Sequence, residues 1–344
     1  MRPRVVDWTL FILVTLATLS GFASFLVGLP KGWWVFMLHG AGGLAVVLPL
    51  VWKMRRVWPR LARPYRWERA TVASLLTLLA VLLVLATGVV WSTWQWPARF
   101  PNGLWWHVAL GLALAILLLF HVILRFKPLR RSDLRDRRAF LHLAGIGLSG
   151  LLLWGGNQAF NRAASTPGDR RRFTGSRNAG DDFPVTMWMF DNPAPIDLST
   201  WRLRITGAVA KEYAVDYTTL AARTRDRQEA TLDCTSGWYT TQRWQGVRVG
   251  HLLAHAQPNT GAVAVSFKSI TGYRWSLPLS EAYAALLATH VGNTPLTHGY
   301  GAPIRLVAPG RRGFQWVKWV TEIEVLTQPD RGQWQTIFLS GLGK

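Results

Sequence analysis

Five apolar runs, each free of Lys, Arg, Asp and Glu, dominate the first half of this 344-residue chain. A helix needs roughly 20 apolar residues to cross the hydrocarbon core of a bilayer, and each run reaches that length. Half of the whole chain is hydrophobic, which is high for a soluble enzyme. The sequence therefore predicts five membrane-spanning helices, at residues 8–29, 33–52, 70–96, 104–124 and 139–160.

The net formal charge of +21 is concentrated around these runs. Residues 1–160 carry +14 of it, and the segments 53–69 and 125–138 contain seven Lys or Arg residues each. Because cytoplasmic loops are enriched in Lys and Arg, the N-terminus and both basic segments are predicted to be cytoplasmic. With five spans, everything after residue 160 then lies outside. The basic excess follows membrane topology and gives no indication of a nucleic-acid partner.

The second half of the chain has a different composition and hydrophobic pattern. Residues 161–183 are polar and rich in Arg, Gly and Ser, which is typical of a linker. Beyond them, short alternating runs are separated by Gly, Pro and Asn, so residues 184–344 are predicted to form a compact α+β domain. The expected strands are 201–209, 262–270, 302–309 and 316–326, and the expected helices are 247–256 and 280–289.

Four histidines lie in the apolar runs, at positions 39, 107, 121 and 142. An ionisable side chain in a spanning helix is costly and indicates function. His107 and His121 are separated by about 21 Å of helical rise and lie on nearly the same face. By depth in the bilayer, His39 matches His107 and His142 matches His121. The alternative interpretation is that these histidines cap helices or hydrogen-bond across the bundle.

The histidine pattern resembles the paired-histidine helices of membrane cytochromes b, in which a four-helix bundle holds haem. The resemblance implies one haem b with its iron held by His39 and His107, and a second haem if His121 and His142 also form a pair.

Cys234, in the segment LDCTSGWYTTQRWQGV, is the single cysteine of the chain, so no intramolecular disulfide can form. Taken alone it is either a buried structural residue or, since a thiolate is a soft ligand, a ligand of a redox metal. The segments that follow it, WQGVRVGHLLAHAQP, FKSITGYRWSLPLSEA and HGYGAPIRLVAPGRRGFQWVKWVTEIEV, resemble the sulfite oxidase fold family of molybdopterin enzymes. The resemblance covers nearly all of residues 184–327. It implies a mixed α+β domain in which Cys234 ligates molybdenum and the later segments hold the pterin.

The same resemblance implies roles for eight further residues. In the periplasmic methionine sulfoxide reductase branch, a pterin-contacting threonine stands at the position of Ser269, and a pterin-site asparagine at that of Tyr300. In the sulfite oxidase branch, His298 corresponds to a histidine of the pterin loop and Tyr273 to an active-site tyrosine that can donate a proton. The other pterin contacts that the family implies are Arg305, Trp316, Val317 and Lys318.

Two departures from the family pattern bear on the substrate. The sulfite oxidase branch has an arginine that helps to hold its anionic substrate, but this chain has Gly180 there, followed by Asp181 and Asp182. This weakens sulfite as a substrate. The tyrosine at position 300 similarly weakens the assignment to methionine sulfoxide.

The stretch DRRAFLHLAGIGLSG, at residues 136–150, resembles a twin-arginine translocation signal in the middle of the chain. Arg137 and Arg138 precede Ala-Phe-Leu and a run of small and apolar residues. Since molybdopterin is inserted into a folded protein in the cytoplasm, a route that exports folded domains would suit the second half. The alternative is that both arginines only flank a span on its cytoplasmic side.

The predicted protein is a multi-pass protein of a bacterial inner membrane with its N-terminus in the cytoplasm and its catalytic domain in the periplasm. The expected parts are a four-helix cytochrome b-like domain at 1–130, a signal-like fifth helix at 131–160, a linker at 161–183 and a molybdopterin oxidoreductase domain at 184–344.

The predicted activity is oxo transfer on a small S- or N-containing substrate, with electrons exchanged through haem b with a quinone or quinol. Its other partners would be membrane lipid and the twin-arginine translocation machinery. Two alternatives remain open: a sulfite-type dehydrogenase, and a non-catalytic haem electron-transfer protein whose outer domain is a metal-free docking module. A transporter is disfavoured because no acidic residue lies inside a predicted span and no inverted repeat is visible.

Overall fold

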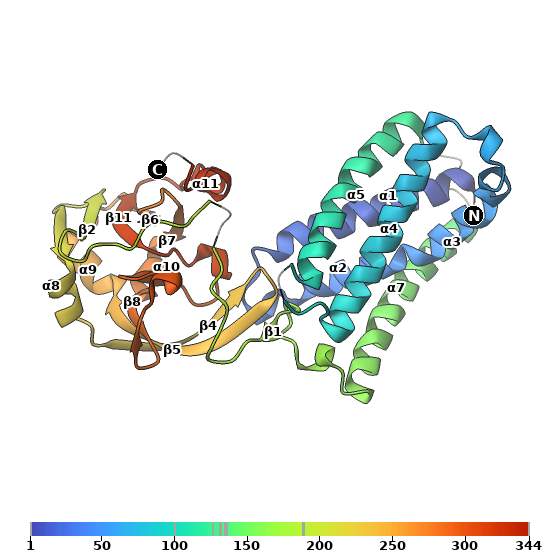
Figure 1. The fold of residues 1–344 in the computed structure, drawn as a ribbon. Coiled ribbons are helices and arrows are strands. Elements are labelled where there is room, and N and C mark those ends of the chain that lie inside the picture. Colours follow the sequence, from blue (N-terminus) through green and yellow to red (C-terminus); the bar gives the residue numbers. More distant parts are fainter. Residues whose placement is uncertain are drawn as a thin grey trace. The chain divides into compact units, whose positions relative to one another are not determined.

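The computed structural model of the chain describes residues 2–99, 101–125, 127–130, 133, 137–187 and 190–342. It divides into two compact units, Met1–Asn178 and Ala179–Lys344, which we call the helical unit and the sheet unit (Figure 1). A first unit that is helical apart from the two-residue strand β1 (Arg177–Asn178) and a mixed-sheet second unit confirm the predicted fold class. The predicted domain boundary at residue 131 lies outside the described residues.

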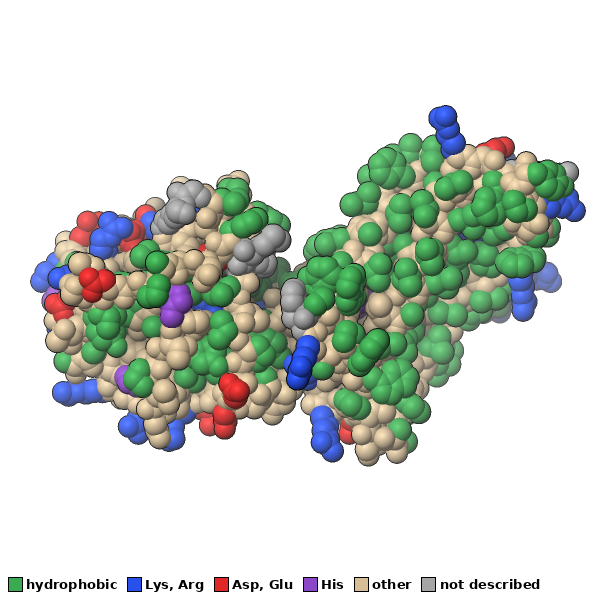
Figure 2. Space-filling model, in the orientation of Figure 1, with side chains coloured by type: hydrophobic (Ala, Val, Ile, Leu, Met, Phe, Trp, Pro, Cys, Tyr) green, Lys and Arg blue, Asp and Glu red, His purple; other side chains and the backbone are tan. Residues whose placement is uncertain are grey.

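Five helical segments of the described chain are long and apolar enough to cross a membrane. They coincide with the five predicted spans, and Figure 2 shows hydrophobic side chains over most of the visible face of this unit. The segments are α1 (Pro3–Ser24), the run Pro30–Leu61, α4 (Arg69–Trp94), α5 (Gly103–Arg125) and α7 (Arg137–Ala163).

The second of these segments is interrupted near its middle. The short helix η1 (Pro30–Gly32) leads into α2 (Trp33–Ala45), and α3 (Val47–Leu61) follows after a break at Val46. Pro49 lies just beyond the break, and a proline has no N–H with which to continue the i to i−4 hydrogen bonds. The apolar run therefore forms two consecutive helices.

Small residues allow α2 and α7 to pack closely. A Cβ atom added at Gly150 of α7 would lie 2.3 Å from the carbonyl oxygen of Ala41 and 2.7 Å from the Cβ of Ala45 on α2. Helices in lipid associate through close backbone approach at small residues because burial of apolar surface gains little there. We infer that a larger side chain at residue 150 would force the two helices apart.

The residues expected to form a linker are ordered against the helical unit up to Asn178. The side chain of Asn161 donates to the carbonyl of Ser92 at 3.1 Å, Arg171 donates to the same carbonyl, and Phe36 packs edge-on against Phe173. These polar side chains satisfy carbonyl groups at the end of α4, which have no partner within the helix. This segment contains η3 (Pro167–Arg170) and β1 (Arg177–Asn178), and the loop between α3 and α4 contains η2 (Pro64–Arg66).

Two sheets form the framework of the sheet unit. In one, β5 (Trp238–Arg248) pairs with β4 (Asp226–Cys234) and β8 (Leu286–Val291), and β8 also pairs with β10 (Arg305–Val307) and β9 (Thr294–Pro295). In the other, the strand order is β3 (Tyr213–Asp216), β2 (Arg202–Gly207), β11 (Val320–Leu326), β6 (Ala264–Ser269) and β7 (Arg274–Pro278). Only β11 and β2 are parallel among the strand pairs of this second sheet that the structure describes.

One buried apolar cluster joins the two sheets. It includes Leu203, Trp244, Phe267 and Leu287, each with no exposed surface. The helices around it are α8 (Tyr217–Ala222), α9 (Val249–Ala256), α10 (Leu279–Ala284) and α11 (Gln333–Leu339), with η4 (His298–Tyr300) and η5 (Gly313–Gln315) in the loops.

The prediction of a helix over 280–289 is wrong in its second half. Helix α10 ends at Ala284, and residues 286–291 form strand β8 between β5 and β10. Leu286, Leu287 and Ala288 are fully buried on both sides of the strand. Periodicity cannot distinguish a short, continuously apolar strand from a buried helix. Here, pairing with β5 and β10 makes the segment a strand.

Candidate functional site

Cys234 is the last residue of β4 and is 9% exposed. Its Sγ lies 3.1 Å from the Oγ of Ser236 and 3.6 Å from the Oγ1 of Thr186. Either hydroxyl can donate a hydrogen bond to the sulfur, which would help to hold it as a metal ligand. These polar surroundings suit a metal ligand better than an inert core thiol.

Two cationic side chains, one buried and one half-buried, lie close enough to this cysteine to interact with it electrostatically. Arg305, on β10, is 2% exposed, and Lys318 follows the η5 loop. A Cβ atom added at Gly301 would lie 3.0 Å from the Cβ of Lys318 and 3.2 Å from that of Arg305, so both side chains leave the backbone beside this glycine. Gly301 has a φ of +103°, which only glycine adopts readily. The turn at residue 301 thus brings the two cations together.

The guanidinium of Arg305 is only partly satisfied. Its Nη1 donates to the carbonyl of Tyr300 at 3.1 Å, and it lies over the rings of Trp244 and Trp316 at 5.3 and 5.9 Å. The buried Nε has no hydrogen-bond partner among the described residues. Burial lowers the pKa of Arg305 to about 10, while Cys234 and Tyr300 oppose that change, so the side chain is charged at neutral pH. An unsatisfied buried donor on a cation indicates a site for an anion or another acceptor.

The ammonium of Lys318 donates to the carbonyls of Thr186 and Gly299, at 2.8 and 2.5 Å. Burial, reinforced by the positive charge of Arg305, lowers the pKa of Lys318 to about 7, and Cys234 and Asp191 act in the opposite direction. The carbonyl of Thr186 binds the lysine while its hydroxyl lies near the sulfur of Cys234, so residue 186 connects the two groups.

Tyr300 and His298 lie in η4 (His298–Tyr300), directly before Gly301. The hydroxyl of Tyr300 donates to the carbonyl of Phe183 at 2.7 Å and its ring stacks on that of Phe183 at 4.4 Å. Burial and the nearby Asp182 raise the pKa of Tyr300. His298 packs against Trp319 at 5.4 Å, and its Nε2 is buried without a partner among the described residues. His298 therefore offers a second unused polar atom.

The remaining predicted residues lie in packed surroundings. Trp316 and Val317 are 2% and 1% exposed, and the carbonyl of Val317 accepts from Leu306 at 2.8 Å. The Oγ of Ser269 accepts from the hydroxyl of Thr271 at 3.0 Å, within the β6–β7 turn. The hydroxyl of Tyr273, which the sequence assigns to proton donation, donates to the carbonyl of Phe314 at 2.6 Å. In this arrangement its proton is used to hold the η5 loop.

A buried ion pair next to Cys234 was not anticipated from the sequence. Arg312 Nη1 lies 2.9 Å from the Oδ1 of Asp233, with side-chain exposures of 5% and 2%, and Nη2 donates to the carbonyl of Cys234 at 3.4 Å. Asp233 and Arg312 also form a backbone β-bridge. The adjacent arginines of GRRGF were a signal, but sequence alone could not say which of them turns inward.

Breaking this pair should destabilise the sheet unit strongly. Replacing Arg312 by methionine removes the buried cation that pairs with the buried carboxylate of Asp233, so we expect a loss of about 3–5 kcal/mol of unfolding free energy. The melting temperature should fall by on the order of 10 °C. The matched control is Arg311→Met, because Arg311 pairs with Glu281 at the surface and should cost at most about 1 kcal/mol. Equal melting temperatures for the two variants would contradict a buried, structural Arg312–Asp233 pair.

The low pKa of Lys318 predicts a pH dependence of stability. Above about pH 7 the folded protein releases the proton that the unfolded chain keeps up to its ordinary pKa of 10.5. The unfolded state then binds more protons, so unfolding free energy should rise by about 2 kcal/mol between pH 7 and pH 9. Below pH 7 Lys318 is protonated in both the folded and the unfolded state, so the full cost of burying its positive charge lowers the unfolding free energy. Replacing Lys318 by methionine should remove this rise, measured by hydrogen exchange of the β11 amides in cofactor-free chain; equal slopes would refute it.

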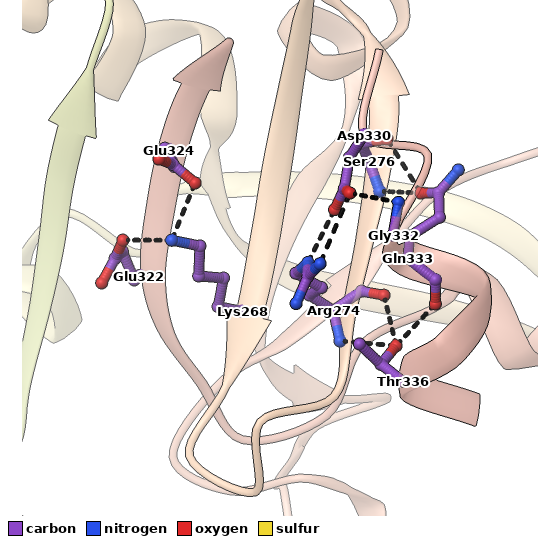
Figure 3. A network of polar contacts seen from close by, with 9 residues as sticks. All are labelled: Lys268, Arg274, Ser276, Glu322, Glu324, Asp330, Gly332, Gln333 and Thr336. Atoms are coloured by element: carbon purple, nitrogen blue, oxygen red, sulfur yellow. Dashed lines mark hydrogen bonds and ion pairs between the residues drawn. The ribbon is translucent and has the colours of Figure 1, made fainter. Parts of the chain in front are cut away.

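An open depression of about 680 Å³ lies elsewhere, on the β11–β6–β7 face. Of the site residues predicted from the sequence, Ser269 alone lines it. The ammonium of Lys268 lies 2.8 Å from a carboxylate oxygen of Glu322 and 2.7 Å from one of Glu324, as Figure 3 shows. Arg204 also pairs with Glu322, and Arg274 pairs with Asp330, so these three basic and three acidic side chains balance in charge. The depression is therefore a weaker candidate than the surroundings of Cys234.

Two of the four predicted haem ligands meet in the helical unit. The rings of His39 on α2 and His107 on α5 lie edge-to-face with their centroids 5.9 Å apart. The Nδ1 of His39 contacts the carbonyl of Ala17 at 2.8 Å, and that of His107 contacts the carbonyl of Val84 at 3.1 Å. A histidine that donates from Nδ1 to a carbonyl presents an unprotonated Nε2, as metal-ligating histidines commonly do.

His121 and His142 have other partners. The Nδ1 of His121 lies 3.2 Å from the Oγ of Ser74. The Nδ1 of His142 lies 2.6 Å from the carbonyl of Arg138 on its own helix, and its ring packs edge-on against Trp52. Among the described residues, the structure shows no ring contact between these two histidines, in contrast to the pair at His39 and His107.

Comparison with known proteins finds similarity over most of the sheet unit. Residues 190–334 match the family described as "Oxidoreductase molybdopterin binding domain". The catalytic subunit MsrP of a protein-methionine-sulfoxide reductase from Xanthomonas campestris pv. campestris is 27% identical over 166 residues, which are 43% of this chain and 52% of that protein. An uncharacterized oxidoreductase, YuiH of Bacillus subtilis, is 28% identical over 163 residues, 46% of this chain and 82% of its own length.

The match to MsrP thus spans about half of that relative. Among solved structures, the sulfane dehydrogenase SoxCD from Paracoccus pantotrophus aligns with a TM-score of 0.38 and 23% identity, over 39% of this chain and 40% of that chain.

Proposed function

We propose that the chain is a membrane-anchored molybdopterin oxidoreductase that exchanges electrons with a quinone through haem b, because residues 190–334 match the molybdopterin-binding oxidoreductase family and the relatives reported above are oxidoreductases. The observation that carries the proposal is the placement of Cys234 near two cationic side chains, the buried Arg305 and the half-buried Lys318. The five apolar helices supply the membrane anchor.

The residues around Cys234 fit a molybdenum–molybdopterin cofactor. Cys234 would bind the metal through its sulfur, and Arg305 and Lys318 would bind the anionic groups of the pterin. The unsatisfied Nε of Arg305 and Nε2 of His298 are the polar atoms that such a ligand would occupy. Ser269, Tyr300, Trp316 and Val317 remain proposed pterin contacts on the strength of the family resemblance.

Each protein group has a task that follows from its position. When bound, molybdenum supplies two-electron redox chemistry and haem supplies single-electron transfer. The hydroxyls of Ser236 and Thr186 lie within hydrogen-bond distance of the Cys234 sulfur and would hold it in position as a metal ligand, and the positive charges of Arg305 and Lys318 would stabilise a metal-bound thiolate. The aromatic rings of Trp244 and Trp316 exclude water from Arg305 and so strengthen its attraction to an anion. For Tyr273 we propose a catalytic role only after its bond to Phe314 is exchanged for one to substrate.

The arrangement of His39 and His107 supports one haem b in the helical unit. Their Nδ1 atoms are engaged by backbone carbonyls of α1 and α4, so each ring is held in place and its Nε2 is available to iron. His121 and His142 stay proposed ligands of a second haem, although their present partners are Ser74 and Arg138.

For the membrane orientation we propose a cytoplasmic N-terminus and a periplasmic sheet unit, because the basic segments 53–69 and 125–138 fit the positive-inside rule. Arg137 and Arg138, at the start of α7, have exposed side chains that a twin-arginine translocation receptor could bind. The substrate that we favour is a neutral S- or N-oxide. Asp182 lies close enough to Tyr300 to raise its pKa, and a carboxylate there would repel an anion such as sulfite.

The decisive experiment is to measure molybdenum and haem per chain in protein purified from its native membrane. The proposal requires one molybdenum and at least one b-type haem, followed by reduction of an S-oxide or N-oxide with electrons from a quinol. A haem-loaded chain without molybdenum would instead support a non-catalytic electron-transfer protein. Turnover of sulfite but not of oxides would support a sulfite-type dehydrogenase.

A further inference from the structure

The C-terminal helix α11 has its polar side turned toward the sheet unit. Gln333 accepts hydrogen bonds at 2.8 Å from both the backbone N–H and the hydroxyl of Ser276 on β7, and the Oγ1 of Thr336 contacts the backbone N–H and carbonyl of Arg274 at 3.4 and 3.3 Å (Figure 3). The Nε and Nη2 of Arg274 also donate to the two carboxylate oxygens of Asp330, at 2.6 and 3.4 Å. The helix is thus held to the sheet by polar contacts, together with the packing of Ile337 and the edge of Trp334.

The apolar side of α11 faces outward. Phe338 is 75% exposed, Leu339 59% and Trp334 44%. Leu342 and Phe190 are also about half exposed, and the backbone of Phe190 packs directly against Gly341. We call Phe190, Trp334, Phe338, Leu339 and Leu342 the C-terminal patch. A soluble helix normally shows the reverse arrangement, so this patch marks an interaction surface.

We propose that the C-terminal patch inserts into the membrane–water interface of the bilayer that the helical unit spans. The composition fits lipid: Trp, Phe and Leu form the apolar side, and residues 332–342 contain no charged side chain. The arginine at 331 precedes this uncharged segment and Lys344 follows it. The family match covers residues 190–334, so Phe338, Leu339 and Leu342 lie outside the matched segment.

The direct connection between the two units keeps the C-terminal patch within reach of the membrane that the helical unit is proposed to span. Asn178 is the last residue of the helical unit and Ala179 is the first residue of the sheet unit, so no linker residues separate the two units. A domain tethered this closely experiences a very high local concentration of membrane surface, and a small apolar patch can then bind stably. A second copy of the chain is a poorer partner, because stable protein interfaces use about 20–30 residues a side.

This inference rests on the proposed membrane location and is tested in the full chain. A photoreactive benzoylphenylalanine at position 338 is compared with one at Tyr283, on α10 and 39% exposed, in neutral phosphatidylcholine vesicles. After irradiation, mass spectrometry should find several times more lipid adducts at residue 338 than at residue 283. Because the patch carries no charge, the lipid adducts should persist in high salt.

Other products would overturn the inference. Adducts from residue 338 to peptides of residues 3–163 would mean that the helical unit covers the patch, and adducts to a second copy would mean a dimer. Absence of adducts would mean that solvent covers it. Alkaline extraction of the same vesicles separates this from the proposed function: a chain that resists extraction but shows no lipid adducts refutes only the patch, whereas an extracted chain refutes the membrane anchor.

Discussion

Replacing Cys234 by alanine is expected to lower oxide-reducing turnover by more than about 100-fold and to remove most of the bound molybdenum. Loss of residues that only support metal ligands costs about 10–100-fold, so loss of the ligand itself should cost at least as much. Turnover is measured with a chemically reduced quinol, and molybdenum by elemental analysis of the same sample. The haem spectrum should not change, because the proposed haem ligands lie in the helical unit.

The matched control is Ser236→Ala, which removes only the hydroxyl that lies 3.1 Å from the sulfur. We expect turnover to fall by about tenfold with molybdenum retained, since one hydrogen bond to a charged acceptor contributes about 1.5–3 kcal/mol. Undiminished turnover in a Cys234→Ala protein that retains molybdenum would exclude Cys234 as the ligand. Loss of turnover together with a large fall in melting temperature would instead indicate misfolding, because the removal of one thiol should change stability little.

The five helices could be predicted from the sequence because a bilayer leaves few options. An uncharged run of about 20 residues must satisfy its backbone internally, and a helix does so without reference to any other part of the chain. The strands at β2, β6, β10 and β11 were also found, since each alternates or is bounded by turn residues. Strand β8 was missed because its neighbours β5 and β10, distant in sequence, decide that it is a strand.

The candidate site shows the same division. Cys234, Arg305 and Lys318 could be picked out because the family resemblance gives their order along the chain. Thr186 and the Asp233–Arg312 pair could not, since each acts through a contact between segments at least 48 residues apart. The acceptor to which a buried hydroxyl donates also cannot be predicted from the sequence. The hydroxyl of Tyr273 was expected to face substrate, and the structure shows it donating to the carbonyl of Phe314.

Replacing either His39 or His107 by alanine is expected to remove one whole haem per chain, seen as loss of the reduced b-type absorbance. Both rings would bind the same iron, so the double variant should lose no more haem than either single variant. Ligands of separate sites would give additive losses, because only residues that share a partner are coupled. Haem is counted by extraction from equal amounts of purified chain.

The other two histidines provide the comparison. His142 contacts the carbonyl of Arg138 and the ring of Trp52, so His142→Ala should leave the His39–His107 haem in place. If His121→Ala and His142→Ala each remove one haem of two, and their double variant removes no further haem, the helical unit holds a second haem. Full haem content in His39→Ala and in His107→Ala would refute the proposed haem site, because each ring is held by a carbonyl of a neighbouring helix, Ala17 or Val84, and no other histidine lies in ring contact with them among the described residues.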